Sequence, residues 1–287
     1  MKEPQLYWSG KNDARRLAEN DLCCTLHPAM PDADSLPKCR HLFLIGDNLT
    51  GLCFLERNSA PRADLIYIDP PYQAYDTTAA QWLSEIYLRL TLARVRMRPE
   101  ALICISINDR FQAELRLLCN EIFGSQNFVA QIVRKRTDIP PRTSRVVQRI
   151  HEYVLVFAKD IKQYLAIHTG PPVPTLWEDE GYSREGAANL ERLVGPHTFS
   201  KAKPVRFIQK CIRFCPKKDA VVLDFYAGSA TTAQAVLELN RTDGGTRSFQ
   251  LIQRRELLPD GEDLTHLALR RIQAVSPGIR LDVLEIK

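Results

Sequence analysis

The sequence predicts an α/β protein with a doubly wound, mostly parallel sheet. Short apolar runs alternate along the chain with amphipathic stretches that are long enough to form helices. Several runs are apolar without interruption, which is typical of strands buried on both faces of a parallel sheet. Two such runs lie within 64–69 and 220–225, and each ends at an Asp and is followed by a turn made of Pro or of small residues. Together these observations favour a sheet covered by helices on both faces.

The predicted elements follow this alternation from one end of the chain to the other. A first strand is expected within His41–Asp47, with a helix after it that runs to Arg57. Further strands are expected at Asp64–Asp69, Ala101–Ile107, Phe128–Val133, Glu152–Ala158, Ala220–Phe225 and Ser248–Gln253. The other predicted helices are Ala79–Arg98, Arg110–Phe123, Pro204–Phe214 and Ala230–Asn240.

Two stretches lack this periodicity and set the predicted domain organisation. Residues 1–40 contain prolines at positions 4, 28, 31 and 37 and are expected to form an irregular N-terminal arm. Residues 41–287 form the main domain. Within it, 131–199 is expected to contain a basic loop and a small irregular lobe, because 159–198 is rich in Gly and Pro.

Composition bounds the class of protein. Hydrophobic residues make up 45% and charged residues 25%, as in ordinary globular proteins. No apolar run approaches the ~20 residues of a membrane span, and Met1–Gly10 lacks the apolar region of a secretory signal. The eight cysteines include no C-x-x-C pair, so we expect free thiols, no metal site and a cytoplasmic location.

Positive charge is concentrated in one segment. The net charge is only +5, yet Gln131–Arg149 contains six basic residues against Asp138 alone. Such a cluster is suited to phosphate groups, although a solvated surface is the simpler alternative for any one of its members. The candidate nucleic-acid-binding residues are Arg134, Lys135, Arg136, Arg142, Arg145 and Arg149.

The stretch Val221–Val236 combines a strand, a turn of small residues and a helix that begins with hydroxyl side chains. Gly228 permits close approach of a ligand to the backbone. The start of the helix offers unpaired N–H groups and the positive end of a dipole to an anion. This pattern is typical of a cofactor-binding turn, but many purely structural turns share it.

A sharper signal is the tetrapeptide Asp69, Pro70, Pro71 and Tyr72 after the second strand. Asp69 can accept a hydrogen bond or a proton from an amine that attacks an electrophile. The prolines stiffen the turn, and the carbonyl of Pro70 can accept a second hydrogen from the same amine. Tyr72 offers a ring on which an extruded base can stack. The alternative is an ordinary Pro-Pro turn.

These motifs together resemble the DNA amino-methyltransferases that modify adenine N6 or cytosine N4. The resemblance also rests on Gly46–Asn48, Ser106–Asp109, Ile122–Phe128, His151–Lys159, Lys203–Pro204, Asp224–Ser229, and Gln253 with Glu256. The catalytic motif precedes the cofactor turn, which marks the permuted β-type branch. The sequences of these motifs are most similar to those of modification subunits of type III restriction-modification systems and their small solitary relatives. This resemblance implies a Rossmann-like methyltransferase sheet with circularly permuted motif order, and it makes the small lobe within 131–199 a candidate target-recognition region.

The resemblance also implies S-adenosyl-L-methionine as the cofactor and assigns residues to it. Phe225, Gly228, Ser229 and Thr231 would line its methionine end with Asp224 beneath them, Glu256 would bind the ribose, Asp47 the adenine amine and Lys203 the carboxylate. Asp69 would border the cofactor as well as the substrate. Each of three assignments has a simpler alternative: Asp47 as a helix cap, Lys203 as a solvated lysine and Glu256 as a surface charge.

The implied activity is methylation of adenine N6 in DNA by base flipping, without a metal. Adenine is favoured over cytosine because Asp rather than Ser opens the tetrapeptide. The family pattern has a second glycine where this chain has Ala230, and Asn-Thr where it has Gln73 and Ala74. Alternatives are an RNA-base or cytosine-N4 methyltransferase, or a catalytically idle nucleic-acid-binding homologue. Expected partners are DNA and a second copy of the chain or a specificity or restriction subunit, with no membrane.

Overall fold

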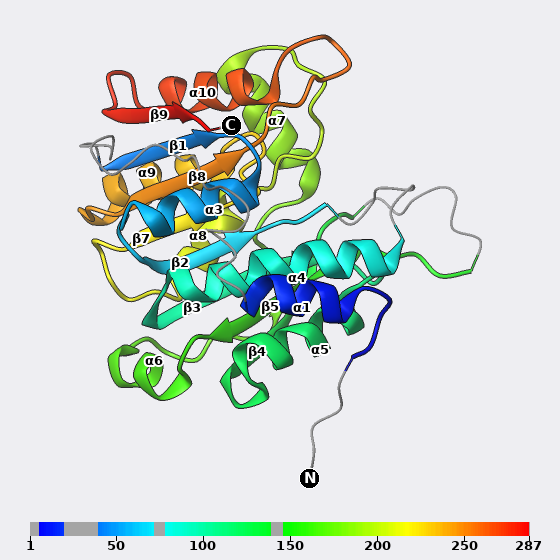
Figure 1. Cartoon of the computed structure of the whole chain (residues 1–287). Helices are drawn as coiled ribbons and strands as arrows, with labels where there is room; N and C mark the ends of the chain where they lie inside the picture. The colour runs from blue at the N-terminus through cyan, green and yellow to red at the C-terminus, as the bar shows by residue number, and fades with distance from the viewer. Residues whose placement is uncertain (1–5, 20–39, 72–77, 139–145, 287) are drawn as a thin grey trace.

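The computed structural model describes residues 6–19, 40–71, 78–138 and 146–286. They contain a nine-stranded sheet in the order β6-β4-β5-β3-β2-β7-β8-β1-β9 (Figure 1). The strands are β1 (His41–Ile45), β2 (Ala63–Ile68), β3 (Met97–Ile107), β4 (Phe128–Lys135), β5 (His151–Ala158), β6 (Leu176–Trp177), β7 (Val221–Asp224), β8 (Ser248–Gln253) and β9 (Leu281–Glu285). The pairings from β3 to β9 are parallel, whereas β5 is antiparallel to both β3 and β4. The predicted mostly parallel sheet is confirmed.

Helices cover both faces of this sheet (Figure 1). They are α1 (Lys11–Glu19), α3 (Asn48–Arg57), α4 (Ala79–Arg96), α5 (Gln112–Phe123), α6 (Ile161–Ile167), α7 (Ser183–Val194), α8 (Val205–Ile212), α9 (Thr231–Asp243) and α10 (Leu264–Val275), with a 3-10 turn at Ser125–Asn127. None of these helices has the length and apolar character needed to cross a membrane.

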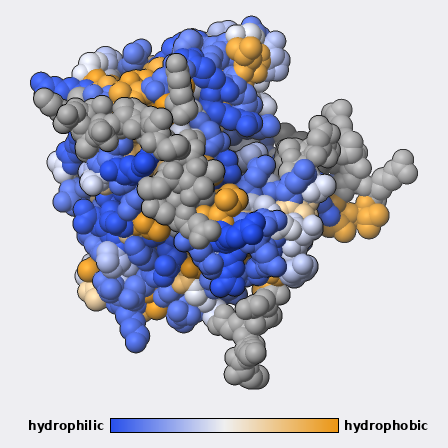
Figure 2. Space-filling view, in the orientation of Figure 1, coloured by the Kyte–Doolittle hydropathy of each residue, from blue (hydrophilic) through white to orange (hydrophobic). Residues whose placement is uncertain are grey.

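The strands are apolar throughout because each contributes to two separate cores. In β1, Leu42 and Leu44 face the core beneath α3 and α4, whereas Phe43 and Ile45 face the core beneath α8 and α9. Successive side chains of a strand point to opposite faces, so a strand with helices on both sides needs an unbroken apolar run. The outer surface is correspondingly hydrophilic over most of the face in Figure 2.

The register of the central strands brings two turns together. Ile66 of β2 pairs with Leu223 of the parallel strand β7. The residues that follow these strands therefore emerge side by side at the carboxyl edge of the sheet. This edge is where open α/β sheets bind their ligands.

Two of the irregular stretches contain more structure than predicted. Part of the expected N-terminal arm forms α1, which packs on α4: Trp8 is buried and donates to Ser84 Oγ (2.8 Å), and Lys11 pairs with Glu121 (2.7 Å). Residues 159–198 include α6, the short edge strand β6 and α7. Tertiary packing supplies what these polar, Gly- and Pro-containing segments lack in periodicity. Whether 131–199 acts as a separate lobe stays a prediction.

Candidate active site

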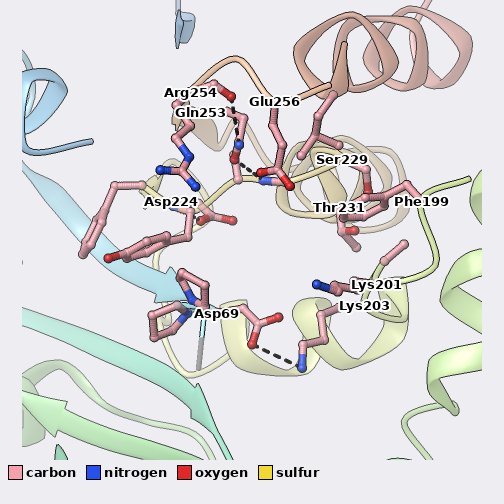
Figure 3. Close-up of a pocket in the computed structure, with 18 of the residues that line it drawn as sticks. Asp69, Phe199, Lys201, Lys203, Asp224, Ser229, Thr231, Gln253, Arg254 and Glu256 are labelled. Atoms are coloured by element: carbon pink, nitrogen blue, oxygen red, sulfur yellow. Dashed lines mark hydrogen bonds and ion pairs between the residues drawn. The ribbon is translucent and has the colours of Figure 1, made fainter. Parts of the chain in front are cut away.

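A cavity of about 1010 Å³ opens at the carboxyl edge of the sheet. Four turns contribute to its wall: those after β1, β2, β7 and β8, joined by Thr198–Lys203 ahead of α8. Figure 3 shows Asp69 and Lys203 on one side, with Ser229, Thr231 and Phe199 across the cavity from the turn after β2. The sequence-predicted residues that line it are Asp47, Asp69, Pro70, Pro71, Arg136, Lys203, Asp224, Phe225, Gly228, Ser229, Thr231 and Glu256.

Asp69 ends a row of alternating charges. Its Oδ1 lies 3.3 Å from Lys203 Nζ, and the same ammonium lies 2.8 Å from Glu152 Oε2. Glu152 is buried and its other oxygen accepts from Arg134 at 2.5 Å. Lys203 is only 12% exposed, so the alternative of a solvated lysine is wrong. Its charge is shared between two carboxylates.

The two carboxylates respond differently to this shared ammonium. Burial raises the pKa of Asp69 above its ordinary value, although Lys203 opposes the shift. Burial acts in the same direction on Glu152, but Lys203 and Arg134 together hold its pKa below the ordinary value. Both carboxylates line the cavity. Of the two, Asp69 is therefore the one that takes up a proton more readily.

The turn after Asp69 is anchored by an aromatic pair that was not predicted. Trp82 Nε1 donates to the Pro71 carbonyl at 2.8 Å, and its ring stacks on Phe111 with centroids 4.6 Å apart. Both rings line the cavity and are nearly buried. The anchor fixes the position of Pro70 and Pro71. Tyr72, Gln73 and Ala74 lie outside the described residues.

The turn after β7 is held from two sides. Asp224 accepts from Thr232 Oγ1 (2.5 Å) and from the backbone of Tyr226 (3.0 Å), and burial raises its pKa to about 7. On the other side, Gly228 has φ 54° and its N–H donates to Gln253 Oε1 at 2.8 Å. Gly permits this left-handed backbone without a steric penalty. The turn therefore presents its backbone to the cavity in one shape.

Ala230 also adopts the left-handed conformation, with φ 61°. Its side chain is fully buried in the core beneath α8 and α9 and does not line the cavity. The methyl group of Ala230, at the position where the family has glycine, therefore does not narrow the cavity. The substitution strains the backbone instead, because L-residues with a Cβ disfavour this region.

Asp47 and Glu256 differ in how they are held. Asp47 Oδ1 caps α3 by accepting from the backbone of Leu49 (2.8 Å) and Thr50 (3.3 Å), and Oδ2 pairs with Arg89 (3.1 Å). The helix-cap alternative is thus correct, and the residue lines the cavity as well. Glu256 is exposed at the rim. The cofactor roles of both stay predictions.

The basic segment requires one correction. Arg134 is fully buried, ion-paired with Glu152 and bonded to the carbonyl of Gly181, so it has no surface for a phosphate. The alternation of β4 turns its side chain inward. Arg136 lines the cavity, Lys135 lies near the ring of Tyr182, and Arg149 is 75% exposed but 3.6 Å from Asp109. Arg142 and Arg145 lie outside the described residues.

Two further charged residues were missed as individual candidates: Glu152 and Arg271. Glu152 lies on the same face of β5 as the buried Val154 and Val156. Arg271 lies on the apolar face of α10 with Leu264, Leu267, Ala268 and Val275. Arg271 is fully buried and bonds to Ser229 and Thr231 of the turn after β7. A charge at an otherwise apolar position is the sequence signal that could have found both.

The fold and the order of the two turns define a Rossmann-like methyltransferase with permuted motifs, since the Asp69 turn on β2 precedes the Gly228 turn on β7. A sequence profile of the family described as DNA methylase, the N6 and N4 methyltransferases, matches residues 63–250. The chain belongs to this family.

Its relatives include two restriction-modification proteins. The StyLTI Mod subunit, from a type III enzyme of Salmonella typhimurium LT2, is 28% identical over an alignment that covers 74% of this chain and 52% of the relative. The type II methyltransferase M.KpnI of Klebsiella pneumoniae is 24% identical, with 73% of this chain and 79% of the relative covered. The chain thus spans about half the length of the StyLTI subunit.

A solved structure shares the fold. TTHA0409 of Thermus thermophilus superposes on this chain with a TM-score of 0.56. That protein is described as a DNA modification methylase, and its structure was solved with S-adenosyl-L-methionine. The match covers 86% of this chain and 99% of the other at 19% identity. At that identity the similarity is one of fold.

Proposed function

We propose that this chain transfers a methyl group from S-adenosyl-L-methionine to N6 of adenine in DNA. The observation that carries the proposal is the adjacency of two turns at one cavity: Asp69–Pro71 after β2 and Gly228–Thr231 after β7. The first offers a carboxylate for an amine, and the second offers backbone N–H groups and hydroxyls for a cofactor. Family membership supports the same chemistry.

The residues present fit such a cofactor. Gly228 leaves space at the cavity wall, since a Cβ there would meet no atom closer than Phe199 at 3.6 Å. Ser229 and Thr231 stand at the start of α9, where an anion is favoured. Glu256 and Asp47 provide carboxylates that can accept from ribose hydroxyls and from an adenine amine.

The cofactor supplies an electrophilic methyl group. Asp69 accepts a hydrogen bond from the target amine and directs its lone pair toward the turn after β7. The carbonyl of Pro70 is expected to take the amine's second hydrogen, and Tyr72 to stack on the extruded base. Because burial raises the pKa of Asp69, this carboxylate is suited to receive the proton that the amine loses. No step requires a metal.

We assign DNA contact to the basic residues of Gln131–Arg149, with the exception of the buried Arg134. Lys135, Arg136 and Arg149 are the described members, with Arg142 and Arg145 beside them in sequence. Changing Arg142, Arg145 and Arg149 to Gln should reduce DNA affinity for all sequences and reduce the log–log salt slope by up to roughly three. Binding isotherms at several salt concentrations measure this slope. An unchanged slope would place the DNA contacts elsewhere.

The deciding experiment uses labelled S-adenosyl-L-methionine with double-stranded DNA and, in a parallel reaction, with RNA, each followed by nucleoside analysis. N6-methyladenine is expected. Label in N4-methylcytosine would replace the proposed base, and label in RNA but not DNA would replace the substrate. No label in either polymer, with intact cofactor binding, would favour the idle homologue. The feature that spoke for that alternative, Ala230, does not narrow the cavity.

Partners and location follow only from similarity. Because relatives include Mod subunits, we propose a second copy of the chain or a specificity or restriction subunit as partner. Size-exclusion chromatography with light scattering tests the first of these. A cytoplasmic location stays a prediction.

A further inference from the structure

Arg271 differs from the other arginines buried in the described part of the chain. Arg96 pairs with Glu56 (2.9 Å), Arg134 with Glu152 (2.5 Å) and Arg247 with Asp243 (2.9 Å). No carboxylate of the described residues lies within ion-pair distance of Arg271, although its side chain is fully buried. Buried charges are ordinarily paired, so this exception calls for a reason.

The partners of Arg271 are neutral, and two of them line the cavity. Its guanidinium donates to Thr231 Oγ1 (2.7 Å), Ser229 Oγ (3.1 Å) and the Ser229 carbonyl (3.3 Å). On the other side it donates to Gln234 Oε1 (2.7 Å) and weakly to Asn189 Oδ1 (3.4 Å). Gln234 in turn donates to Glu238 (2.7 Å), so a carboxylate is reached only through an amide.

The direction of these bonds determines what the hydroxyls can do. A guanidinium has only donors, so Ser229 and Thr231 act as acceptors toward Arg271. The hydrogen of each hydroxyl is then left to donate, and both residues belong to the cavity wall. Two hydroxyl donors in front of a buried cation, at the start of α9, form a site that favours an anion.

Lys203, the cation to which the resemblance assigns the cofactor carboxylate, is already placed between Asp69 and Glu152. We propose that Arg271 is instead the counter-charge for that carboxylate and acts through Ser229 and Thr231 as a positioning residue. The inference rests on the proposed function. Burial lowers the pKa of Arg271 to about 9, which leaves it charged at neutral pH and sensitive to an incoming anion.

The test compares two ligands in calorimetry with the full chain. S-adenosyl-L-homocysteine carries the amino-acid end, and 5′-methylthioadenosine lacks it. Arg271→Gln should weaken binding of the first by about tenfold, as expected for losing one charge-assisted interaction, and leave the second within about twofold. The amino-acid end of the ligand carries an ammonium and a carboxylate. A cationic Arg271 repels the ammonium, so removing Arg271 cannot weaken binding through that group. A loss confined to S-adenosyl-L-homocysteine therefore identifies the carboxylate as the group that Arg271 attracts.

A matched control is Arg247→Gln, which removes a buried arginine that does not line the cavity and is paired with Asp243. It should lower the melting temperature and leave the affinity for both ligands unchanged. If Arg271→Gln does not fold, Thr231→Val removes the connecting hydroxyl and should show the same selective loss. Equal losses for both ligands, or none, would overturn the inference. A wild-type chain that binds neither ligand would overturn the proposed function itself.

Discussion

The two sides of the cavity handle buried charge in opposite ways. On the β2 side, Asp69, Lys203, Glu152 and Arg134 alternate in sign and neutralise one another. On the β7 side, Arg271 and Asp224 are each bonded to neutral groups. A self-compensated row needs no ligand charge to neutralise it. Charges without a charged partner respond more strongly to a ligand that binds beside them. A ligand is therefore expected to change the electrostatics most on the β7 side.

The largest effect is expected for the carboxylate at the end of the compensated row. Asp69→Ala should reduce methyl transfer by roughly 10²-fold or more while the protein remains folded, because the proposed mechanism assigns this carboxylate to proton transfer and orientation. Turnover is measured beside a thermal melt. Retention of more than about a tenth of wild-type turnover would remove Asp69 from the mechanism.

The next effect concerns stability on the same side. Glu152→Gln leaves Arg134 buried without its carboxylate, and breaking such a pair costs about 3–5 kcal/mol. Glu256→Gln changes an exposed carboxylate and should alter the free energy of unfolding by less than about 0.5 kcal/mol. Urea denaturation of both variants measures the two changes in the free energy of unfolding. Equal stabilities would mean that the row is not a unit.

On the β7 side, pH separates the isolated charge from the paired ones. The pKa of Asp224 rises from an ordinary 3.8 to about 7 on folding, so the folded chain holds this proton more tightly. Its contribution to stability therefore falls as pH rises from about 4 to about 7.

Asp224→Asn removes this titration, and its amide can replace both contacts: the oxygen can accept from the Tyr226 N–H, and the NH2 group can donate to Thr232 Oγ1. Relative to wild type, the variant should gain up to about 4 kcal/mol between pH 4 and pH 8, as measured by denaturant unfolding. A difference that is constant across this range would show that Asp224 is ionised in the folded protein at all these values.

The smallest effect is a backbone one. Ala230→Gly relieves a left-handed alanine, but glycine has more freedom in the unfolded chain, so the net gain should be under about 1 kcal/mol. The matched change is Gly244→Ala, at φ 66° with no atom near its added Cβ, which should lose a similar amount. If urea denaturation shows that both variants change the free energy of unfolding in the same direction, left-handed backbone strain does not explain the difference.

Sequence reasoning recovered what periodicity encodes. All seven predicted strands are present, because a strand between two helical layers must be apolar on both faces, as Leu42 and Phe43 illustrate. The strands β6 and β9 were not predicted. β6 has two residues, and β9 lies at the sheet edge, where Asp282 and Glu285 interrupt the apolar pattern.

The site divides in the same way. Motifs that are contiguous in sequence, such as Asp69–Pro71 and Gly228–Thr231, could be found by inspection, and they do meet at the cavity. The side chains that hold them come from distant elements: Trp82 from α4, Glu152 from β5 and Arg271 from α10. Arg134 shows the converse, since its membership of a basic run gave no sign that β4 turns it into the core.

Of the three tryptophans, Trp8 and Trp177 do not line the cavity, while Trp82 belongs to its wall and is bonded to the Pro71 carbonyl. Indole emission depends on hydrogen bonding and on nearby stacked rings. The protein therefore contains its own optical probe at the Asp69 turn, and no dye has to be attached there. Replacing Trp8 and Trp177 with Phe would leave Trp82 as the single tryptophan, and its emission would test whether the proposed base binds beside the Asp69 turn.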